Sequence, residues 1–274
     1  MKKENSCIPN IVTACLLVVN IGAVAAKESP APPPRTPVRA IGYLPADELP
    51  SSVALIPPPP AAESAAMARD EEINRKALAL QGSPRWDMAA HDAVLGFPAA
   101  AKTFACALNI PIDEERTPRL IALMRKTLVD AGRATSEAKR HYRRTRPFAT
   151  NDKPTCTPTG EDNLRRDGSY PSGHSSAGWA FGLVLGEVAP ERIDAILRRA
   201  RAFGDSRTVC NVHWQSDVEA GRMVAAGVVA RLHAEPAFRE DIAAARAEVE
   251  ALRAQGLTAD RDCDAEANIV ASWN

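Results

Sequence analysis

Apolar residues recur every three or four positions over most of the chain after residue 60. One such stripe follows Pro118 and comprises Leu120, Leu123, Met124 and Leu128. This spacing places the side chains on one face of a helix, and Thr117 with Pro118 offers a capping hydroxyl and a first helical residue. Pro190 and Pro236 begin two similar patterns, and Gly256 is a stop signal after the second.

Two other segments, 173–188 and 214–233, are strongly apolar. Helices of this kind are buried inside a protein rather than laid on its surface. No segment alternates apolar and polar residues over a useful length, and no internal repeat is visible. The pattern therefore predicts an all-α, single-domain helical bundle.

The ends of the chain differ from this body. Residues 27–60 hold 11 of the 22 prolines, a composition that favours extended chain over helix. We expect 27–40 to be a flexible Pro-rich segment and 41–60 to dock on the bundle through its apolar residues. The helical domain is then predicted at 41–256, with a C-terminal tail at 257–274.

The first 26 residues have the layout of a secretory signal peptide. Lys2 and Lys3 precede an apolar run over 11–26, which ends in small residues before Lys27. The mature part has no run of about 18 consecutive apolar residues, so no membrane span is predicted there. The protein is therefore expected to be periplasmic or secreted.

Composition allows a sizeable core and directs attention to local charge. The chain has 274 residues, 45% of them apolar and 25% charged, with a formal net charge of zero. Without a global basic field, neither a nucleic-acid polymer nor an acidic membrane surface is an expected partner.

Export changes the interpretation of the cysteines. Cys7 and Cys15 would leave with the signal peptide, and four remain: Cys106, Cys156, Cys210 and Cys263. An even number in an oxidising compartment predicts two disulfides, in any of three connectivities. A zinc site is the alternative, although no two of the four lie within metal-ligand spacing of each other.

Three short clusters carry the candidate chemistry. They are Lys139 with Arg146-Pro147, then Pro171-Ser172-Gly173-His174, then Ser206-Arg207 with His213 and Asp217. Three cations, two imidazoles and a carboxylate suit the binding of a phosphate-like oxyanion while one imidazole attacks and the other donates a proton. No metal-ligand pattern accompanies them.

Each cluster also has a plainer interpretation. His213 and Asp217 lie four residues apart, so on a helix the carboxylate can orient the imidazole, yet surface His-Asp pairs of this kind are common. Ser172 is a natural N-cap that would open a helix N-terminus to an anion, with Gly173 allowing close approach. His174 could be incidental in such a turn.

The cations Lys139, Arg146 and Arg207 could equally be solvated, and part of the crowded run 143–146 is expected to be so. However, Pro147 tends to end a helix at Arg146, and guanidinium groups match phosphate oxygens bidentately. Each charge-assisted hydrogen bond of this kind contributes about 1.5–3 kcal/mol.

Taken together, the three clusters resemble the tripartite signature of the type 2 phosphatidic acid phosphatase superfamily, which includes lipid phosphatases and vanadium haloperoxidases. The segment 168–175, Gly-Ser-Tyr-Pro-Ser-Gly-His-Ser, is similar to the motif of class A bacterial non-specific acid phosphatases, where the last position is usually threonine. Leu55-Ile56 with Pro57–Pro60, Arg146-Pro147-Phe148, Thr155-Cys156 and 209–217 also resemble that class. The resemblance covers about residues 41–250.

The resemblance implies a metal-independent acid phosphatase, without a cofactor, that hydrolyses many small phosphomonoesters through a phosphohistidine. His213 would be the nucleophile, Asp217 its orienting group and His174 the acid and base. The phosphate oxygens would be held by Lys139, Arg146, Ser172, Gly173 and Arg207.

Shorter members of the class commonly keep only the cysteines that match Cys156 and Cys210, which implies the pairs Cys156–Cys210 and Cys106–Cys263. Relatives often self-associate, so a homo-oligomer is an open alternative. Three other functions compete: a vanadium-dependent haloperoxidase, a lipid phosphate phosphatase, and a binding protein that keeps the clamp without catalysis. The preferred substrate, and the balance between hydrolysis and phosphate transfer, do not follow from spacing.

Overall fold

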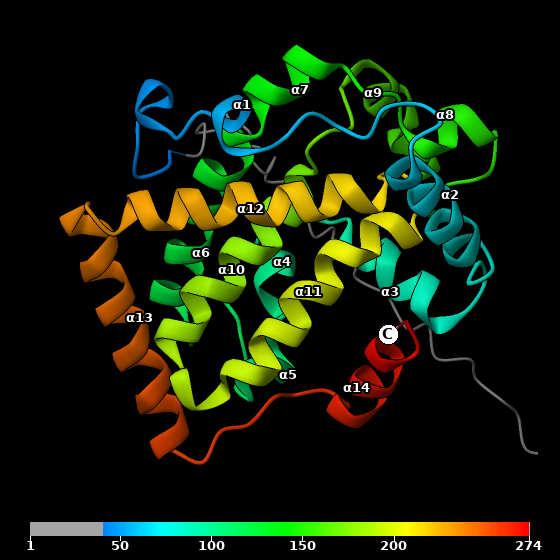
Figure 1. The fold of residues 1–274 in the computed structure, drawn as a ribbon. Helices are drawn as coiled ribbons and strands as arrows, with labels where there is room; N and C mark the ends of the chain where they lie inside the picture. Colours follow the sequence, from blue (N-terminus) through cyan, green and yellow to red (C-terminus); the bar gives the residue numbers. More distant parts are fainter. Residues whose placement is uncertain (1–40, 274) are drawn as a thin grey trace, which may run out of the picture. The chain divides into compact units, whose positions relative to one another are not determined.

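The computed structural model describes residues 41–273, and all its regular structure in that range is helical (Figure 1). The longer helices are α2 (Ala65–Leu78), α3 (Pro84–Asp92), α6 (Pro118–Ala134), α10 (Gly173–Val188), α11 (Ile193–Val209), α12 (Gln215–Leu232), α13 (Pro236–Ala254) and α14 (Cys263–Ala271). The shorter ones are α1 (Ser52–Leu55), α4 (Ala99–Lys102), α5 (Ala105–Leu108), α7 (Ser136–Tyr142), α8 (Pro147–Asn151) and α9 (Glu161–Arg166). The predicted all-α class is confirmed.

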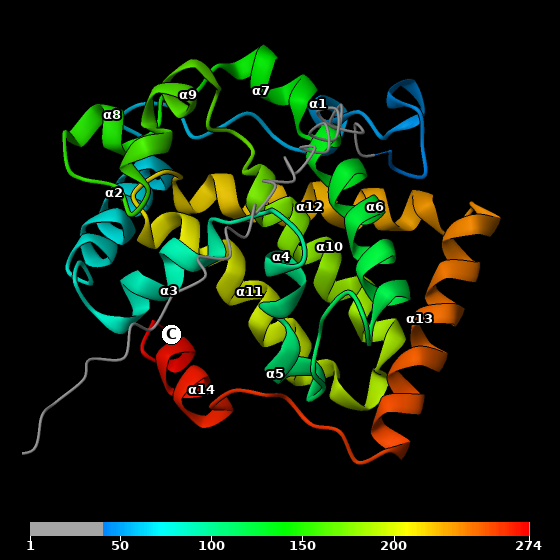
Figure 2. The ribbon, with the colours of Figure 1, turned by 180° about the vertical axis from the view of Figure 1, so that it is seen from behind.

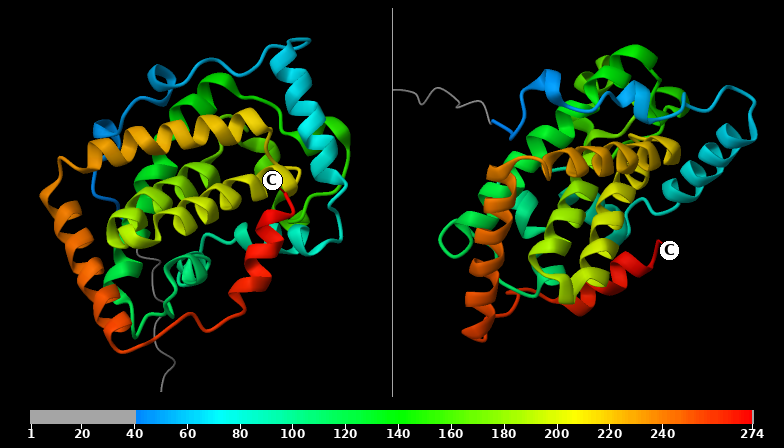
Figure 3. Two further views of the ribbon diagram at one scale, coloured as in Figure 1. Left: turned by 60° about the horizontal axis from the view of Figure 1, so that its bottom comes forward. Right: turned by 60° about the vertical axis from the view of Figure 1, so that its left-hand side comes forward.

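Helix α10 lies at the centre of the bundle and contacts α6, α11, α12 and α13. Figure 3 shows α10 and α11 side by side, with α12 across them. Phe181, Val184 and Leu185 of α10 are fully buried. The two strongly apolar segments of the sequence therefore correspond to α10, which is buried along most of its length, and to α12, which is buried on one side while Met223 is 51% exposed.

Glycines on α10 permit the close approach of α11. A Cβ atom built on Gly178 would lie 2.4 Å from the Phe203 ring, and one on Gly182 would lie 2.5 Å from the Ala200 Cβ. Because the two glycines are four residues apart, they line one face of the helix. Larger residues at these positions would push α11 away from the core.

The predicted helix starts are found with small differences. Helix α6 begins at Pro118, but the Thr117 hydroxyl does not cap it; instead it donates to the Asp113 carbonyl oxygen at 2.8 Å. The helix predicted from Pro190 opens with a 3-10 turn, Pro190–Arg192, before α11. Helix α13 begins at Pro236, and Gly256 follows it with a φ of +74°.

Residues 41–60 lie against the helices. Leu44 and Ile56 are buried, and the Tyr170 hydroxyl donates to the Pro57 carbonyl oxygen at 2.7 Å. The predicted signal peptide and the flexible segment up to residue 40 fall outside the described residues. The segment predicted as a C-terminal tail contains α14, which contacts α3.

Two disulfides join distant parts of the chain. Cys106–Cys263 ties α14 to α5, with the Cα atoms 5.3 Å apart, and Cys156–Cys210 ties the loop after α8 to the end of α11, with the Cα atoms 4.8 Å apart. The predicted pairing is confirmed. No helix within residues 41–273 is both long enough and apolar enough to cross a bilayer.

Candidate active site

The three clusters meet where α7, α8 and α9 cover one end of the bundle, a region visible from both sides (Figures 1 and 2). His213 lies in the turn between α11 and α12 rather than on a helix. Its backbone NH donates to the Arg207 carbonyl oxygen at 3.2 Å, which joins the nucleophile candidate to the third cation. Asp217 is in the first turn of α12, so the four-residue relation holds although His213 precedes the helix.

The contacts of His213 define which ring nitrogen is free. Nδ1 lies 3.2 Å from Oδ2 of Asp217, and Nε2 lies 2.9 Å from Nη1 of Arg146. A carboxylate only accepts and a guanidinium only donates, so Nδ1 carries the proton and Nε2 presents its lone pair. Burial, followed by the charges of Arg146 and Lys139, lowers the pKa of His213 well below its usual value. The ring is therefore a neutral, oriented nucleophile candidate.

The Asp217 carboxylate is fully buried and saturated with donors. Oδ2 accepts from the Ser169 hydroxyl at 2.6 Å and from the Trp214 backbone NH at 2.9 Å, and Oδ1 accepts from Arg144 Nη1 at 2.6 Å. Burial raises the pKa of Asp217, while Arg144 leads the groups that oppose this. Its charged form thus depends on these donors.

Arg144 is a functional candidate that the sequence did not single out. Its side chain is 9% exposed and pairs with both Asp217 and Asp70, whose Oδ2 lies 2.8 Å from Nη2. Asp70 also accepts from the Ser216 backbone NH at 2.8 Å. Arg143, by contrast, is exposed, so the expectation that part of this run is solvated holds for Arg143 and not for Arg144.

Ser172 caps α10 as predicted and faces the same site. Its Oγ accepts from the Ser175 backbone NH at 3.2 Å and from the Ser175 hydroxyl at 2.9 Å, which leaves its own proton for another acceptor. The Ser172 backbone NH donates to the Asp217 carbonyl oxygen at 2.9 Å. A Cβ built on Gly173 would meet only Thr135 Oγ1, at 3.6 Å, so the space beside this backbone is open.

His174 lies in the first turn of α10 and is half-buried. Nε2 is 3.0 Å from the Ala93 carbonyl oxygen, and because a carbonyl only accepts, Nε2 carries a proton and Nδ1 is the basic nitrogen. Burial, then the positive charge of Arg207, lowers the pKa of His174 well below its usual value, and the Ala93 carbonyl opposes this.

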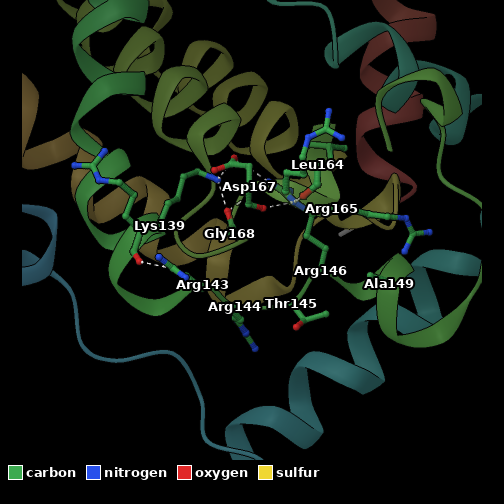
Figure 4. Close-up of a pocket in the computed structure, with 12 residues that line it drawn as sticks. Lys139, Arg143, Arg144, Thr145, Arg146, Ala149, Leu164, Arg165, Asp167 and Gly168 are labelled. Carbon is green, nitrogen blue, oxygen red and sulfur yellow. Dashed lines mark hydrogen bonds and ion pairs between the residues drawn. The ribbon is translucent and has the colours of Figure 1, made fainter. Parts of the chain in front are cut away.

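Lys139 and Arg146 lie together and share one carboxylate (Figure 4). Asp167 Oδ2 is 2.8 Å from Lys139 Nζ and 3.2 Å from Arg146 Nη2, and Lys139 also donates to the Gly168 carbonyl oxygen at 2.5 Å. The sequence predicted that a helix ends at Arg146. Instead α7 ends at Tyr142, Arg146 is the N-cap residue of α8, and Pro147 is the first residue of that helix.

Arg207 is a buried cation without a carboxylate partner in the described part of the chain. It is 2% exposed, and its one hydrogen-bonding contact there is Cys210 Sγ, 3.9 Å from Nη1. Burial, with repulsion from Arg146, lowers the pKa of Arg207 to about 9. The neighbouring Ser206 donates to Asp92 at 2.6 Å instead, so it supports α11 rather than the anion site.

The arrangement as a whole suits a tetrahedral oxyanion. Arg146 lies 2.9 Å from the His213 ring, Lys139 shares Asp167 with Arg146, and the Arg207 backbone bonds to that of His213. All three cations lower the pKa of His213. A buried, unpaired guanidinium is costly without an anion. Within residues 41–273, no group of three or more histidine, cysteine, aspartate or glutamate side chains is arranged to ligate a metal ion.

Comparison with known proteins identifies the family of this chain. Residues 120–239 match the model of the PAP2 superfamily. The chain is 42% identical over 212 residues to a non-specific acid phosphatase of Providencia stuartii, covering 77% of this chain and 86% of that protein.

Two further relatives give similar values. A non-specific acid phosphatase of Salmonella typhimurium is 43% identical over 71% of this chain and 78% of its own length, and an acid phosphatase of Zymomonas mobilis is 39% identical over 74% and 77%. The chain therefore belongs to the PAP2 superfamily and, within it, to the class A bacterial non-specific acid phosphatases.

Proposed function

We propose that this protein, an acid phosphatase by family, hydrolyses small phosphomonoesters at the His213 site through a phosphohistidine intermediate. The observation that carries the proposal is the pair of contacts made by the His213 ring. Asp217 holds the proton on Nδ1, so the Nε2 lone pair is directed toward Arg146. A nucleophile beside a cation that can bind a phosphoryl oxygen is the arrangement that phosphoryl transfer requires.

In the first step, Nε2 of His213 attacks phosphorus and the bond from phosphorus to the ester oxygen breaks. When the bound phosphate offsets the positive charge of Arg207, which helps lower the pKa of His174, His174 takes a proton on Nδ1. It gives this proton to the departing alkoxide, so the alcohol leaves neutral. The positive charge that forms on the His213 ring is balanced by Asp217. That carboxylate keeps its charge in a buried position because Arg144, Ser169 and the Trp214 NH all donate to it.

In the second step, His174 removes a proton from water, the water oxygen attacks phosphorus, and the bond between phosphorus and Nε2 breaks. Inorganic phosphate and free His213 result. The Ala93 carbonyl favours the proton on Nε2 of His174, so Nδ1 is the nitrogen that exchanges the catalytic proton.

The non-bridging oxygens would be held by Lys139, Arg146 and Arg207, with the Ser172 hydroxyl and the Gly173 NH. Donors that are already in place when charge builds in the transition state need no reorganisation then. The open space beside Gly173 and the unpaired Arg207 support this assignment. Three cations in place of a metal ion make the proposed reaction independent of added divalent metals.

Export of the enzyme is also part of the proposal. Two disulfides join residues that are 157 and 54 positions apart, and such bonds persist in oxidising compartments such as the periplasm. Together with the predicted signal peptide, they support a periplasmic or secreted enzyme.

The test is to trap the phosphoenzyme. Brief reaction with a ³²P-labelled monoester, followed by denaturation in base or in acid, should give a protein label that survives base and is lost in acid. His213→Ala should abolish both the label and turnover, whereas His91→Ala, which changes an exposed histidine on α3, should alter neither. A label stable to acid, or a His213→Ala variant with full activity, would refute the covalent mechanism.

A further inference from the structure

A strongly cationic pocket of about 420 Å³ adjoins the phosphate clamp (Figure 4). Lys139 and Arg146 line this pocket and also belong to the clamp, so the two spaces share a wall. Seven of the residues that line the pocket are lysine or arginine, and only Asp167 is acidic. On a chain with zero formal net charge, this is a marked local excess of positive charge.

Most cations of this pocket already have an anionic partner. Asp167 is shared by Lys139 and Arg146, Arg144 is held between Asp70 and Asp217, and Arg165 lies 3.6 Å from Glu161. These contacts therefore pair four of the seven cations with carboxylates.

The exposed rim is different. Arg140, Arg143 and Arg166 have no carboxylate partner within residues 41–273. Arg143 donates only to the Arg140 carbonyl oxygen, at 3.3 Å, and Arg166 only to the Asn163 side-chain oxygen, at 2.6 Å. Three guanidinium groups without a carboxylate partner in the described residues therefore line the exposed part of this pocket, the rim.

These arginines come from two segments that meet at Gly168. A Cβ built on Gly168 would lie 2.6 Å from the Lys139 carbonyl oxygen and 3.3 Å from the Arg143 Cα, so the Gly168 backbone packs directly on the end of α7. The segment that carries Arg166 therefore adjoins the segment that carries Arg140 and Arg143. An anion bound among these arginines would offset their like charge.

We propose that this rim is a second anion-binding site, which selects phosphomonoesters whose alcohol part carries another anionic group, a carboxylate or a second phosphate. The inference rests on the proposed function. Arg143 directly follows α7, and its backbone NH donates to the Lys139 carbonyl oxygen at 3.1 Å, so the rim begins next to the clamp. The second anion should therefore lie a few bonds from the ester oxygen, as in a three-carbon compound.

The experiment compares two substrates that differ only in this group. Glycerol 3-phosphate and 3-phosphoglycerate have similar size and the same phosphate, but the second carries a carboxylate. A charge pair at about 7 Å in water changes the rate constant by about threefold. We therefore expect kcat/KM to be about three- to tenfold higher for 3-phosphoglycerate at low salt, with a smaller ratio at high salt because ions screen the rim.

The Arg143→Gln/Arg166→Gln double variant should bring this ratio close to one. Arg75→Gln, which removes an exposed arginine of α2 outside the pocket, should keep the wild-type ratio. Because the readout is a ratio within each variant, it does not depend on the absolute activity. A wild-type ratio near one, or a double variant that keeps the wild-type ratio, would overturn the inference.

A binding measurement separates this inference from the proposed function. If the protein hydrolyses neither substrate, the proposed function fails, and the rim is then tested by titration calorimetry with propylphosphonate and 3-phosphonopropionate. Binding of the carboxylated compound about three- to tenfold tighter, with the preference lost in the double variant, supports the rim site. Equal affinities would overturn it.

Discussion

Arg144 should be the residue whose loss damages both stability and catalysis, although it touches no expected substrate atom. In the variant Arg144→Met the aliphatic volume remains, but Asp217 and Asp70 lose their shared cation. These carboxylate side chains are 0% and 1% exposed, so neither can recover solvation by turning to water. Removing one partner of a buried ion pair costs about 3–5 kcal/mol.

For a domain of this size, 1 kcal/mol corresponds to about 2–4 °C in the unfolding midpoint. The variant should therefore unfold about 6–20 °C below the wild type in a calorimetric scan at neutral pH. Arg69→Met is the matched control, because Arg69 pairs with Glu219 while both side chains are about half exposed. An exposed pair of this kind contributes about 0–1 kcal/mol, so that midpoint should move by at most about 4 °C.

The catalytic effect should have its own signature. Burial raises the pKa of Asp217, and the charge of Arg144 is the largest effect that lowers it. Without Arg144, Asp217 should therefore become protonated at a higher pH. A protonated Asp217 no longer balances the charge on His213. The acid limb of the kcat profile should move to higher pH, and kcat at neutral pH should fall about 10- to 100-fold, the equivalent of one charge-assisted hydrogen bond.

Two outcomes would refute this reasoning. If Arg144→Met and Arg69→Met lose the same stability, the buried network does not hold the fold as the distances imply. If Arg144→Met loses stability but keeps its kcat profile when assayed well below its midpoint, Asp217 does not depend on Arg144 for its charge.

Three other results are expected. The pKa values of His213 and His174 are lowered in the folded state, so the stability that they contribute is complete above pH 6.5 and falls below it, by up to about 1.4 kcal/mol per pH unit for each ring. In His174→Gln the unfolding midpoint should therefore fall less steeply between pH 8 and pH 5 than in the wild type. An equal slope in the two proteins would count against a buried, neutral His174. Asp167→Asn should strengthen inhibition by inorganic phosphate about three- to tenfold, since the carboxylate no longer competes for Lys139 and Arg146. Asp162→Asn changes an exposed neighbour and should leave the Ki for phosphate unchanged. Weaker inhibition of Asp167→Asn would contradict this competition. The double variant Cys106→Ser/Cys263→Ser should lose about 2–5 kcal/mol of unfolding free energy in chemical denaturation, with little change in kcat. A large loss of kcat in the folded variant would contradict this and show that α14 supports the site.

The sequence predicted what periodicity and local chemistry can carry. The apolar runs located α10 and α12, and Ser172 was recognisable as a cap because capping is decided within three residues. The candidate residues on three separate segments could be assigned to one site only through the family resemblance. The structure brings these segments together, since Ser172 NH bonds to the Asp217 carbonyl and His213 NH bonds to that of Arg207.

What the sequence could not predict are contacts between segments that no motif marks. Asp70 lies 147 positions before Asp217, and the two share Arg144 only because α2 packs near the start of α12. Asp167 likewise looks like an ordinary acidic residue until the fold places it between Lys139 and Arg146. Thr117 shows the reverse case: its hydroxyl oxygen accepts from the Asp113 backbone NH at 3.1 Å instead of from an NH of α6, so a residue type that favours capping does not cap this helix.

The distribution of buried charge explains how one site can be both stable and ready to bind an anion. On one side of His213, the carboxylates of Asp217 and Asp70 are both paired with Arg144. On the other side, Lys139 and Arg146 share one carboxylate, that of Asp167, whose side chain is 53% exposed, and Arg207 pairs with no carboxylate of the described residues. The first group has two carboxylates and one guanidinium, so it keeps one net negative charge, which orients the His213 ring and can balance a positive charge on it. The second group carries an excess of positive charge that a phosphate dianion would complete, so binding energy is concentrated on the side where the phosphoryl group must lie for Nε2 to reach it.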